Sequence, residues 1–188
     1  MKKIIFLDRD GVINVDHNYV YKIEDFEFEK NVIPGLKILE QNGFHFIIIT
    51  NQSGIGRGLF THQDLALVMN RLDSILDPAG AGFHGFYYCP HDPRDRCSCR
   101  KPGTGLLAEA GILPALDRGR SWMIGDKASD VAMGRALGVG AILVRTGYGA
   151  QSEQEVRRRW AQDPAVRVAQ DLAAAVDLVL ARPGGAAA

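Results

Sequence analysis

The sequence predicts a single α/β domain with a mainly parallel sheet and helices on both faces. Short apolar runs alternate with segments whose apolar residues recur at helical spacing, the pattern of parallel strands joined by crossover helices. The run HFIIIT at 45–50 is apolar almost throughout, as expected of a strand buried on both faces. With 188 residues, 46% hydrophobic and 23% charged, the chain has the size and composition of one globular domain. We expect this domain to span 1–182, followed by a disordered tail at 183–188.

The first half of the chain contains signals for three strands and two helices. The expected strands are 3–8, 45–50 and 84–88. Pro34 is typical of a helix start, and Gly43 is typical of the residue that follows a helix end. Thr61 is a good N-cap, Asp64 lies in the first turn, and apolar residues at helical spacing follow over 65–76.

The second half continues the alternation. The expected elements are a helix at 104–111, a strand at 121–126, a helix at 129–137, a strand at 141–145 and a helix at 171–181. We predict no helix or strand for the charged stretch RRRW at 157–160. We find no internal repeat and no interdomain linker.

Charge and hydropathy exclude several classes of protein. Twenty-two basic residues balance 22 acidic ones, so no net field attracts the chain to nucleic acid or to a membrane surface. The longest apolar runs are far shorter than a membrane span. The N-terminal segment MKKIIFLD reaches an aspartate at position 8, which leaves no room for a signal peptide. We therefore expect a cytoplasmic protein.

Three predicted strands end in polar residues that would meet at one edge of the sheet. These residues are Asp8 and Asp10, Thr50 and Asn51, and Gly125 and Asp126. Ligands of open parallel sheets bind outside the carboxyl ends of the strands. A single strand that ends in Asp-x-Asp-Gly is more often a simple turn. Because two further strands end in polar residues, we interpret this edge as a functional site.

The residues at this edge suit phosphate chemistry. Asp8, Asp10 and Asp126 could bind Mg²⁺ through carboxylate oxygens, while Lys101 and Lys127 supply positive charge. Two like charges about 4 Å apart repel by roughly 4 kcal/mol at an effective dielectric near 20. An aspartate can therefore approach a phosphate dianion only where cations neutralise both groups.

The chain's three cysteines lie close together in CPHDPRDRCSC. Cys89, His91, Cys97 and Cys99 form two ligand pairs that could close a tetrahedron around Zn²⁺. The set has no open position, so the metal would be structural, and it would stabilise a loop with little apolar surface. The alternative is a reduced loop with incidental cysteines.

The motifs DRDGV at 8–12, TNQSG at 50–54, RKP at 100–102 and GDKASD at 125–130 resemble those of the haloacid dehalogenase (HAD) superfamily of phosphatases. They occur in the order that the superfamily requires, and the resemblance spans 4 to about 147. It implies a Rossmann-like domain. The cysteine loop followed by RKP is similar to one branch of the superfamily, whose members lack a large cap domain.

The resemblance implies a role for each residue of the edge. Asp8 would be the nucleophile and Asp10 the general acid and base, while Thr50 and Lys101 would bind the phosphoryl oxygens. Asp126, Asp8 and the main-chain carbonyl of Asp10 would bind Mg²⁺. Alternation along an extended segment would place Arg9 on the side opposite Asp8 and Asp10.

Two assignments have alternatives. Asp130 could support the metal site from a distance, or it could be a helix-start residue favoured by the dipole. His17 and Tyr19 could contact the substrate or be ordinary loop residues.

The same branch comprises phosphatases of heptose bisphosphates and of histidinol phosphate. Segments 15–28 and 50–58 resemble those of the heptose-bisphosphate phosphatases. This resemblance implies that the substrate is a small sugar bisphosphate, D-glycero-D-manno-heptose 1,7-bisphosphate, which would lose its 7-phosphate in ADP-heptose biosynthesis for lipopolysaccharide. Histidinol phosphate is the alternative. The expected substrate contacts are Asp16, His17, Asn18, Tyr19, Thr50, Asn51, Gln52, Ser53, Arg100, Lys101 and Lys127. Arg100 would bind the second phosphate through its guanidinium fork. The resemblance also suggests a monomer.

Overall fold

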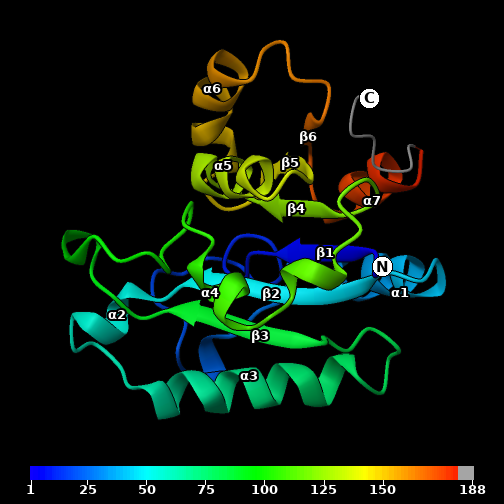
Figure 1. The fold of residues 1–188 in the computed structure, drawn as a ribbon. Coiled ribbons are helices and arrows are strands. Elements are labelled where there is room, and N and C mark those ends of the chain that lie inside the picture. The colour runs from blue at the N-terminus through cyan, green and yellow to red at the C-terminus, as the bar shows by residue number, and fades with distance from the viewer. Residues whose placement is uncertain (182–188) are drawn as a thin grey trace.

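The computed structural model describes residues 1–181, and within this range a six-stranded sheet has the order β3-β2-β1-β4-β5-β6 (Figure 1). All neighbouring strands pair in parallel. The strands are β1 (Ile4–Leu7), β2 (His45–Asn51), β3 (Gly85–Cys89), β4 (Trp122–Gly125), β5 (Gly140–Val144) and β6 (Val166–Ala169). The predicted α/β fold with a parallel sheet is confirmed.

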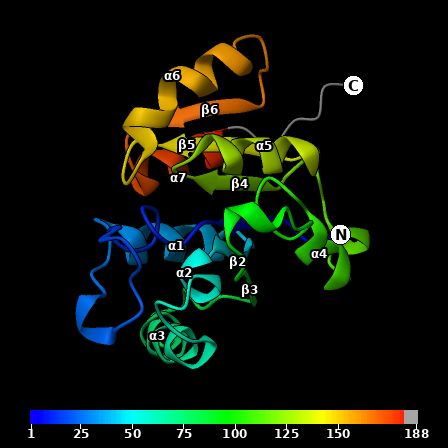
Figure 2. The same ribbon diagram turned by 90° about the vertical axis from the view of Figure 1, so that its left-hand side faces the viewer.

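Helices cover both faces of the sheet, and Figures 1 and 2 show α3 and α6 at opposite ends of the molecule. The α-helices are α1 (Val32–Gln41), α2 (Ser53–Gly56), α3 (His62–Leu76), α4 (Gly105–Glu109), α5 (Ala128–Ala136), α6 (Gly149–Arg159) and α7 (Leu172–Ala181). Short 3-10 turns are η1 (Ile23–Asp25), η2 (Pro93–Asp95) and η3 (Leu113–Ala115). No helix among the described residues is long and apolar enough to span a membrane.

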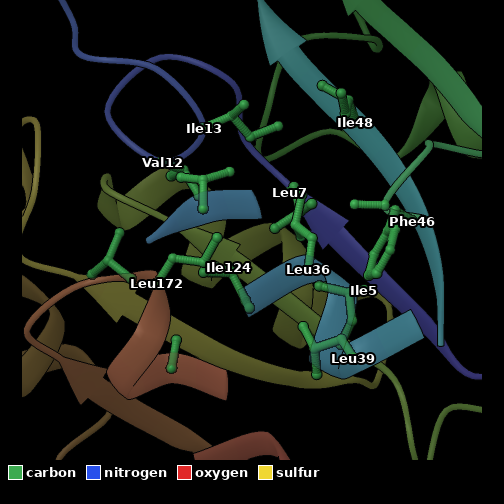
Figure 3. Packing of buried hydrophobic residues seen from close by; sticks show 14 of the residues in the cluster. Ile5, Leu7, Val12, Ile13, Leu36, Leu39, Phe46, Ile48, Ile124 and Leu172 are labelled. Carbon is green, nitrogen blue, oxygen red and sulfur yellow. The ribbon is translucent and has the colours of Figure 1, made fainter. Parts of the chain in front are cut away.

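Alternation along β1 divides the core into two main clusters. Ile5 and Leu7 pack with residues of α1, α3 and α7, whereas Ile4 and Phe6 pack with residues of α4 and α5. Figure 3 shows Leu36 beside the side chains of β1. Burial of each such side chain contributes roughly 1.5–3 kcal/mol. A slip of one residue would exchange the two faces, so this burial sets the register of the sheet.

The register brings three strand ends to one level. Leu7 lies opposite Ile48 in β2 and opposite Ile124 in β4. Asp8, Thr50 and Asp126 therefore follow within two residues of the same level, at the edge where the sequence predicts a site.

The helix signals of the sequence were mostly accurate. Thr61 caps α3 in a capping box with Asp64, and Gly43 follows α1 with a φ of 75°. However, α1 begins at Val32, before Pro34, so the prediction of Pro34 as the start was late by two residues. Pro34 lies within the first turn, where its missing N–H has no intrahelical partner to lose.

The elements α6 and β6, and the four-residue helix α2, were not predicted from the sequence. Of the eleven residues of α6, Gly149 and Val156 are buried, so its apolar stripe is too narrow to recognise. Ion pairs between residues four apart support its exposed face, as between Glu153 and Arg157. The stretch 157–160 comprises the last three residues of this helix and Trp160, which follows it. β6 is a four-residue edge strand of which only Ala169 is buried, whereas the equally short β1 and β4 are buried throughout and gave the apolar runs by which they were predicted. The predicted tail at 183–188 lies outside the described residues.

Candidate active site

A cavity of about 430 Å³ opens at the carboxyl ends of β1, β2 and β4. It is lined by Asp8, Asp10, Asp16, Asn18, Tyr19, Thr50, Asn51, Gln52, Ser53, Arg100, Lys101, Lys127, Ser129 and Tyr148. The structure thus brings together all the residues that the sequence analysis placed at the substrate, except His17. The imidazole of His17 is half exposed and lies 3.5 Å from the carboxylate of Glu27 instead.

Two lining residues were not predicted. Ser129 lies within the motif GDKASD but offers no distinctive chemistry. Tyr148 follows β5, and its ring packs under the ammonium of Lys127 with Nζ 4.7 Å from the ring centroid. Its hydroxyl lies 3.2 Å from Oδ1 of Asn18. A polar residue just after a fifth parallel strand is the signal that could have identified it.

Lys101 is a buried cation between two buried carboxylates. Its Nζ lies 2.9 Å from Oδ1 of Asp8 and 2.7 Å from Oδ1 of Asp130, and it donates to the carbonyl of Ile49 at 2.8 Å. Burial alone would lower the pKa of Lys101, but the charges of Asp130 and Asp8 outweigh it and the pKa lies above its ordinary value. Lys101 therefore neutralises Asp8 with a charge that does not titrate near neutral pH.

Both carboxylate oxygens of Asp130 have partners, and one of these contacts is that of the helix-start alternative. One carboxylate oxygen accepts from the backbone N–H of Lys127 at 2.9 Å, as a helix-start residue does, and the other pairs with Lys101. Asp130 is fully buried. It therefore joins the first turn of α5 to the cation that contacts Asp8.

Asp126 is enclosed by two glycines. A Cβ on Gly11 would lie 2.5 Å from its Oδ2, and a Cβ on Gly147 would lie 2.4 Å from the same atom. Oδ2 accepts from the backbone N–H of Tyr148 at 2.8 Å. Oδ1 is buried and has no hydrogen-bond partner within residues 1–181. Burial raises the pKa of Asp126 to about 7, and the charge of Asp8 adds to this effect.

These carboxylates fit a divalent cation. Oxygens of Asp8, Asp126 and Asp130 lie within 4.8 Å of one another, and all three residues are buried. A hard cation would satisfy the orphaned Oδ1 of Asp126 and offset its repulsion from Asp8. The carboxylate of Asp10 lies outside this group, so Asp10 could contribute only through its main chain.

The carboxylate of Asp10 is instead fixed by donors. Its Oδ1 accepts from Nη2 of Arg9 at 2.6 Å and from Asn14 at 3.0 Å, and its Oδ2 accepts from Gln52 at 2.9 Å. Burial raises the pKa of Asp10, but the charge of Arg9 and these hydrogen bonds outweigh burial and leave the pKa below its ordinary value.

The predicted orientation of Arg9 was wrong. Its guanidinium turns back to Asp10 and also donates to the carbonyl of Val20 at 2.7 Å. The reason is that β1 ends at Leu7, so the alternation of an extended strand does not apply to residues 8–10.

The rest of the cavity offers positive charge and polar donors. Nη1 of Arg100 is buried without a hydrogen-bond partner in the described part of the chain, which leaves it available to an anion. Lys127 lies 3.7 Å from Asp16 and 3.6 Å from Asp126. Thr50 is buried, with its hydroxyl accepting from Gln52 at 2.9 Å. Carboxylates and cations side by side suit a phosphate ester bound with a metal ion.

The cysteine loop forms a second cluster of ligands. Sulfur atoms of Cys89, Cys97 and Cys99 lie 3.2–3.5 Å apart, and Nδ1 of His91 lies 3.1 Å from Sγ of Cys99. Tetrahedral bonds of about 2.3 Å to Zn²⁺ would separate sulfur ligands by roughly 3.8 Å. The four side chains therefore fit a tetrahedral metal ion after small adjustments.

Comparisons with known proteins agree with this chemistry. The family described as HAD-hydrolase-like matches residues 98–175. Proteins named D-glycero-beta-D-manno-heptose-1,7-bisphosphate 7-phosphatase are similar to this chain over 164 residues. The one from Yersinia pestis is 40% identical, covering 83% of this chain and 87% of its own. The one from Escherichia coli K12 is 42% identical, covering 83% and 86%.

Solved structures give the same result. A D,D-heptose 1,7-bisphosphate phosphatase from B. bronchiseptica, complexed with magnesium and phosphate, aligns with a TM-score of 0.84 and 29% identity over 95% of this chain and 98% of its own. The corresponding enzyme from Burkholderia thailandensis aligns with a TM-score of 0.70 and 27% identity over 96% and 100%.

Proposed function

The chain belongs to the HAD superfamily of phosphatases, and on that premise we propose that it removes the 7-phosphate of D-glycero-β-D-manno-heptose 1,7-bisphosphate. The observation that supports the assignment of this substrate is the 40–42% identity, over most of both chains, to proteins named for this reaction. The cavity supports this assignment, because it contains Asp8 paired with Lys101, and it also contains Arg100 and Lys127, which can bind a second phosphate. The protein would act in ADP-heptose biosynthesis, as a cytoplasmic monomer.

In the first step Asp8 attacks phosphorus. Lys101 and the backbone N–H of Arg9 both bind its Oδ1, so we assign the attack to Oδ2. A bond forms between Oδ2 and phosphorus while the bond from phosphorus to the sugar oxygen breaks. Asp10 gives its proton to that leaving oxygen, which yields the alcohol and an aspartyl-phosphate.

In the second step water hydrolyses the aspartyl-phosphate. Asp10 removes a proton from the water, the water oxygen bonds to phosphorus, and the bond to Asp8 breaks to release phosphate. The hydrogen bonds from Arg9, Asn14 and Gln52 keep Asp10 ionised in the free protein. The negative charge of an arriving phosphate favours protonation of Asp10, which prepares it as the acid.

Asp8, Asp126 and the main-chain carbonyl of Asp10 would hold Mg²⁺. When bound, this ion neutralises charge on the phosphoryl oxygens and orients them for in-line attack. Thr50 binds the same oxygens, and so does Lys101, which exchanges one of its three present partners, Asp8, Asp130 or the carbonyl of Ile49, for the phosphoryl group. Arg100 binds the second phosphate, and Lys127 adds charge beside it.

The cysteine loop would hold structural Zn²⁺ through Cys89, His91, Cys97 and Cys99. Its closed ligand set leaves no position for substrate, so its contribution is to fold the loop.

Comparison of substrates tests the assignment. We expect kcat/KM to be highest for the β-anomer of heptose 1,7-bisphosphate, lower for the α-anomer, and lowest for histidinol phosphate. Asp8→Asn is the matched control, since it keeps the shape of the side chain but removes the nucleophile. A preference for histidinol phosphate would overturn the substrate. Substantial residual activity of Asp8→Asn would overturn the mechanism.

A further inference from the structure

Tyr19 lines the cavity on a strained segment of backbone. Asn18 and Tyr19 have φ values of 60° and 59°, in the left-handed region that residues other than glycine rarely adopt. The ring of Tyr19 lies directly on α2, where a Cβ on Gly54 would approach Cδ1 of Tyr19 to 2.8 Å. A strained segment of this kind persists only where its surroundings stabilise it.

Arg57, the residue that follows α2, supplies such a contact. Its Nη1 donates to the hydroxyl of Tyr19 at 2.8 Å, and its Nε donates to Oδ2 of Asp92 at 2.9 Å. Arg57 is not among the residues that line the cavity, whereas Tyr19 is. The nearly buried carboxylate of Asp92 orients the planar guanidinium, and the guanidinium orients the phenol.

Asp92 belongs to the cysteine loop, which is joined at two further points to α2 and to Gln52, the residue before it. The backbone N–H of Gln52 donates to the carbonyl of Cys89 at 2.8 Å, and that of Gly56 donates to the carbonyl of Pro90 at 2.8 Å. A Cβ on Gly56 would lie 2.8 Å from the same carbonyl oxygen, so the helix and the loop are in direct contact. The loop and α2 therefore form one support behind the wall that contains Tyr19.

We propose that Arg57 is a positioning residue for the sugar. It transmits the geometry of the cysteine loop, through Asp92, to the hydroxyl of Tyr19, and thereby sets the affinity for the heptose. The inference rests on the proposed function, because it concerns the wall that would contact the sugar. The side chain of Arg57 bonds to Tyr19 and Asp92, and no hydrogen bond or ion pair joins it to Thr50 or Lys101 in the described part of the chain. The expected effect is therefore on KM more than on kcat.

Arg57→Leu tests the proposal on two substrates, heptose 1,7-bisphosphate and p-nitrophenyl phosphate, which has no sugar. We expect KM for the heptose bisphosphate to rise roughly 5- to 30-fold, the range for loss of one or two kcal/mol. The change on p-nitrophenyl phosphate should be much smaller. Arg94→Leu is the matched control, because Arg94 pairs with the same Asp92 but its side chain is 88% exposed. It should leave both substrates unchanged.

A double-mutant cycle separates positioning from a general structural role. In a Tyr19→Phe background the hydroxyl is absent, so Arg57→Leu should add less than about twofold to KM. An undiminished effect in that background would overturn the proposal, as would equal losses on both substrates. Wild-type protein that cleaves p-nitrophenyl phosphate but not heptose bisphosphate would overturn the proposed function, and this inference with it.

Discussion

Replacement of Lys101 by methionine should destabilise the protein and abolish its activity. Methionine has a similar length but no charge, so Asp8 and Asp130 would remain buried without their cation. The carbonyl of Ile49 would also lose its donor. Removal of one partner from a buried ion pair costs about 3–5 kcal/mol, because the remaining charge stays desolvated. The side chain of Lys101 is 2% exposed, so solvent can do little to reduce this cost.

The loss should also depend on pH in a defined direction. Burial raises the pKa of Asp130, while Lys101 lowers it, so the variant has a higher pKa at this carboxyl than the wild type. A raised carboxyl pKa gives stability at low pH that is lost as pH rises through that pKa. We therefore expect the destabilisation by Lys101→Met to be smaller at pH 5 than at pH 8.

Urea unfolding at both pH values measures the effect. Lys37→Met is the control, since Lys37 is exposed on α1 and its replacement should change stability by less than about 0.5 kcal/mol. Adding Asp130→Asn to Lys101→Met removes one of the stranded charges and should restore part of the stability but none of the activity. A loss below about 1 kcal/mol in the single variant, or an effect that grows as pH falls, would refute the reasoning.

Three further predictions concern the two candidate metal sites. As the pH is lowered below 7, Mg²⁺ affinity, measured by calorimetry, should fall by up to about tenfold per pH unit, because protonation of Asp126, with its pKa of about 7, competes with the metal. A flat profile from pH 6 to 8 would contradict this. Gly147→Ala should weaken Mg²⁺ binding and lower the melting temperature, since a Cβ there would lie 2.4 Å from Oδ2 of Asp126; unchanged affinity would exclude this packing. Cys99→Ser should reduce the zinc content of purified protein below one equivalent by elemental analysis and lower its stability, and wild-type protein without zinc would remove the assignment of the metal.

Local signals in the sequence were sufficient for much of the fold and of the cavity. The capping box at Thr61 involves residues three apart, and the continuous apolar run of β2 reports burial on both faces. The grouping of the strand-end residues Asp8, Thr50 and Asp126 was also predictable. Each follows a recognisable strand, and the carboxyl ends of parallel strands meet at one edge of the sheet.

Weak local signals explain the elements that were missed. The buried stripe of α6 is narrow, and β6 contains four residues at the edge of the sheet. In such elements stability depends on contacts with distant segments, which leave little periodicity in the sequence.

The sequence by itself determined the chemical groups and the edge of the sheet at which they meet, because motif order and strand polarity are properties of the chain. Only the tertiary structure decided how those groups pair. Lys101 lies between Asp8 and Asp130, which are distant in sequence, and Arg9 turns to Asp10 because the strand ends before it. Arg57 joins Tyr19 to Asp92 in the same way. Side-chain pairing over long sequence separations follows from packing in three dimensions, which no local pattern encodes.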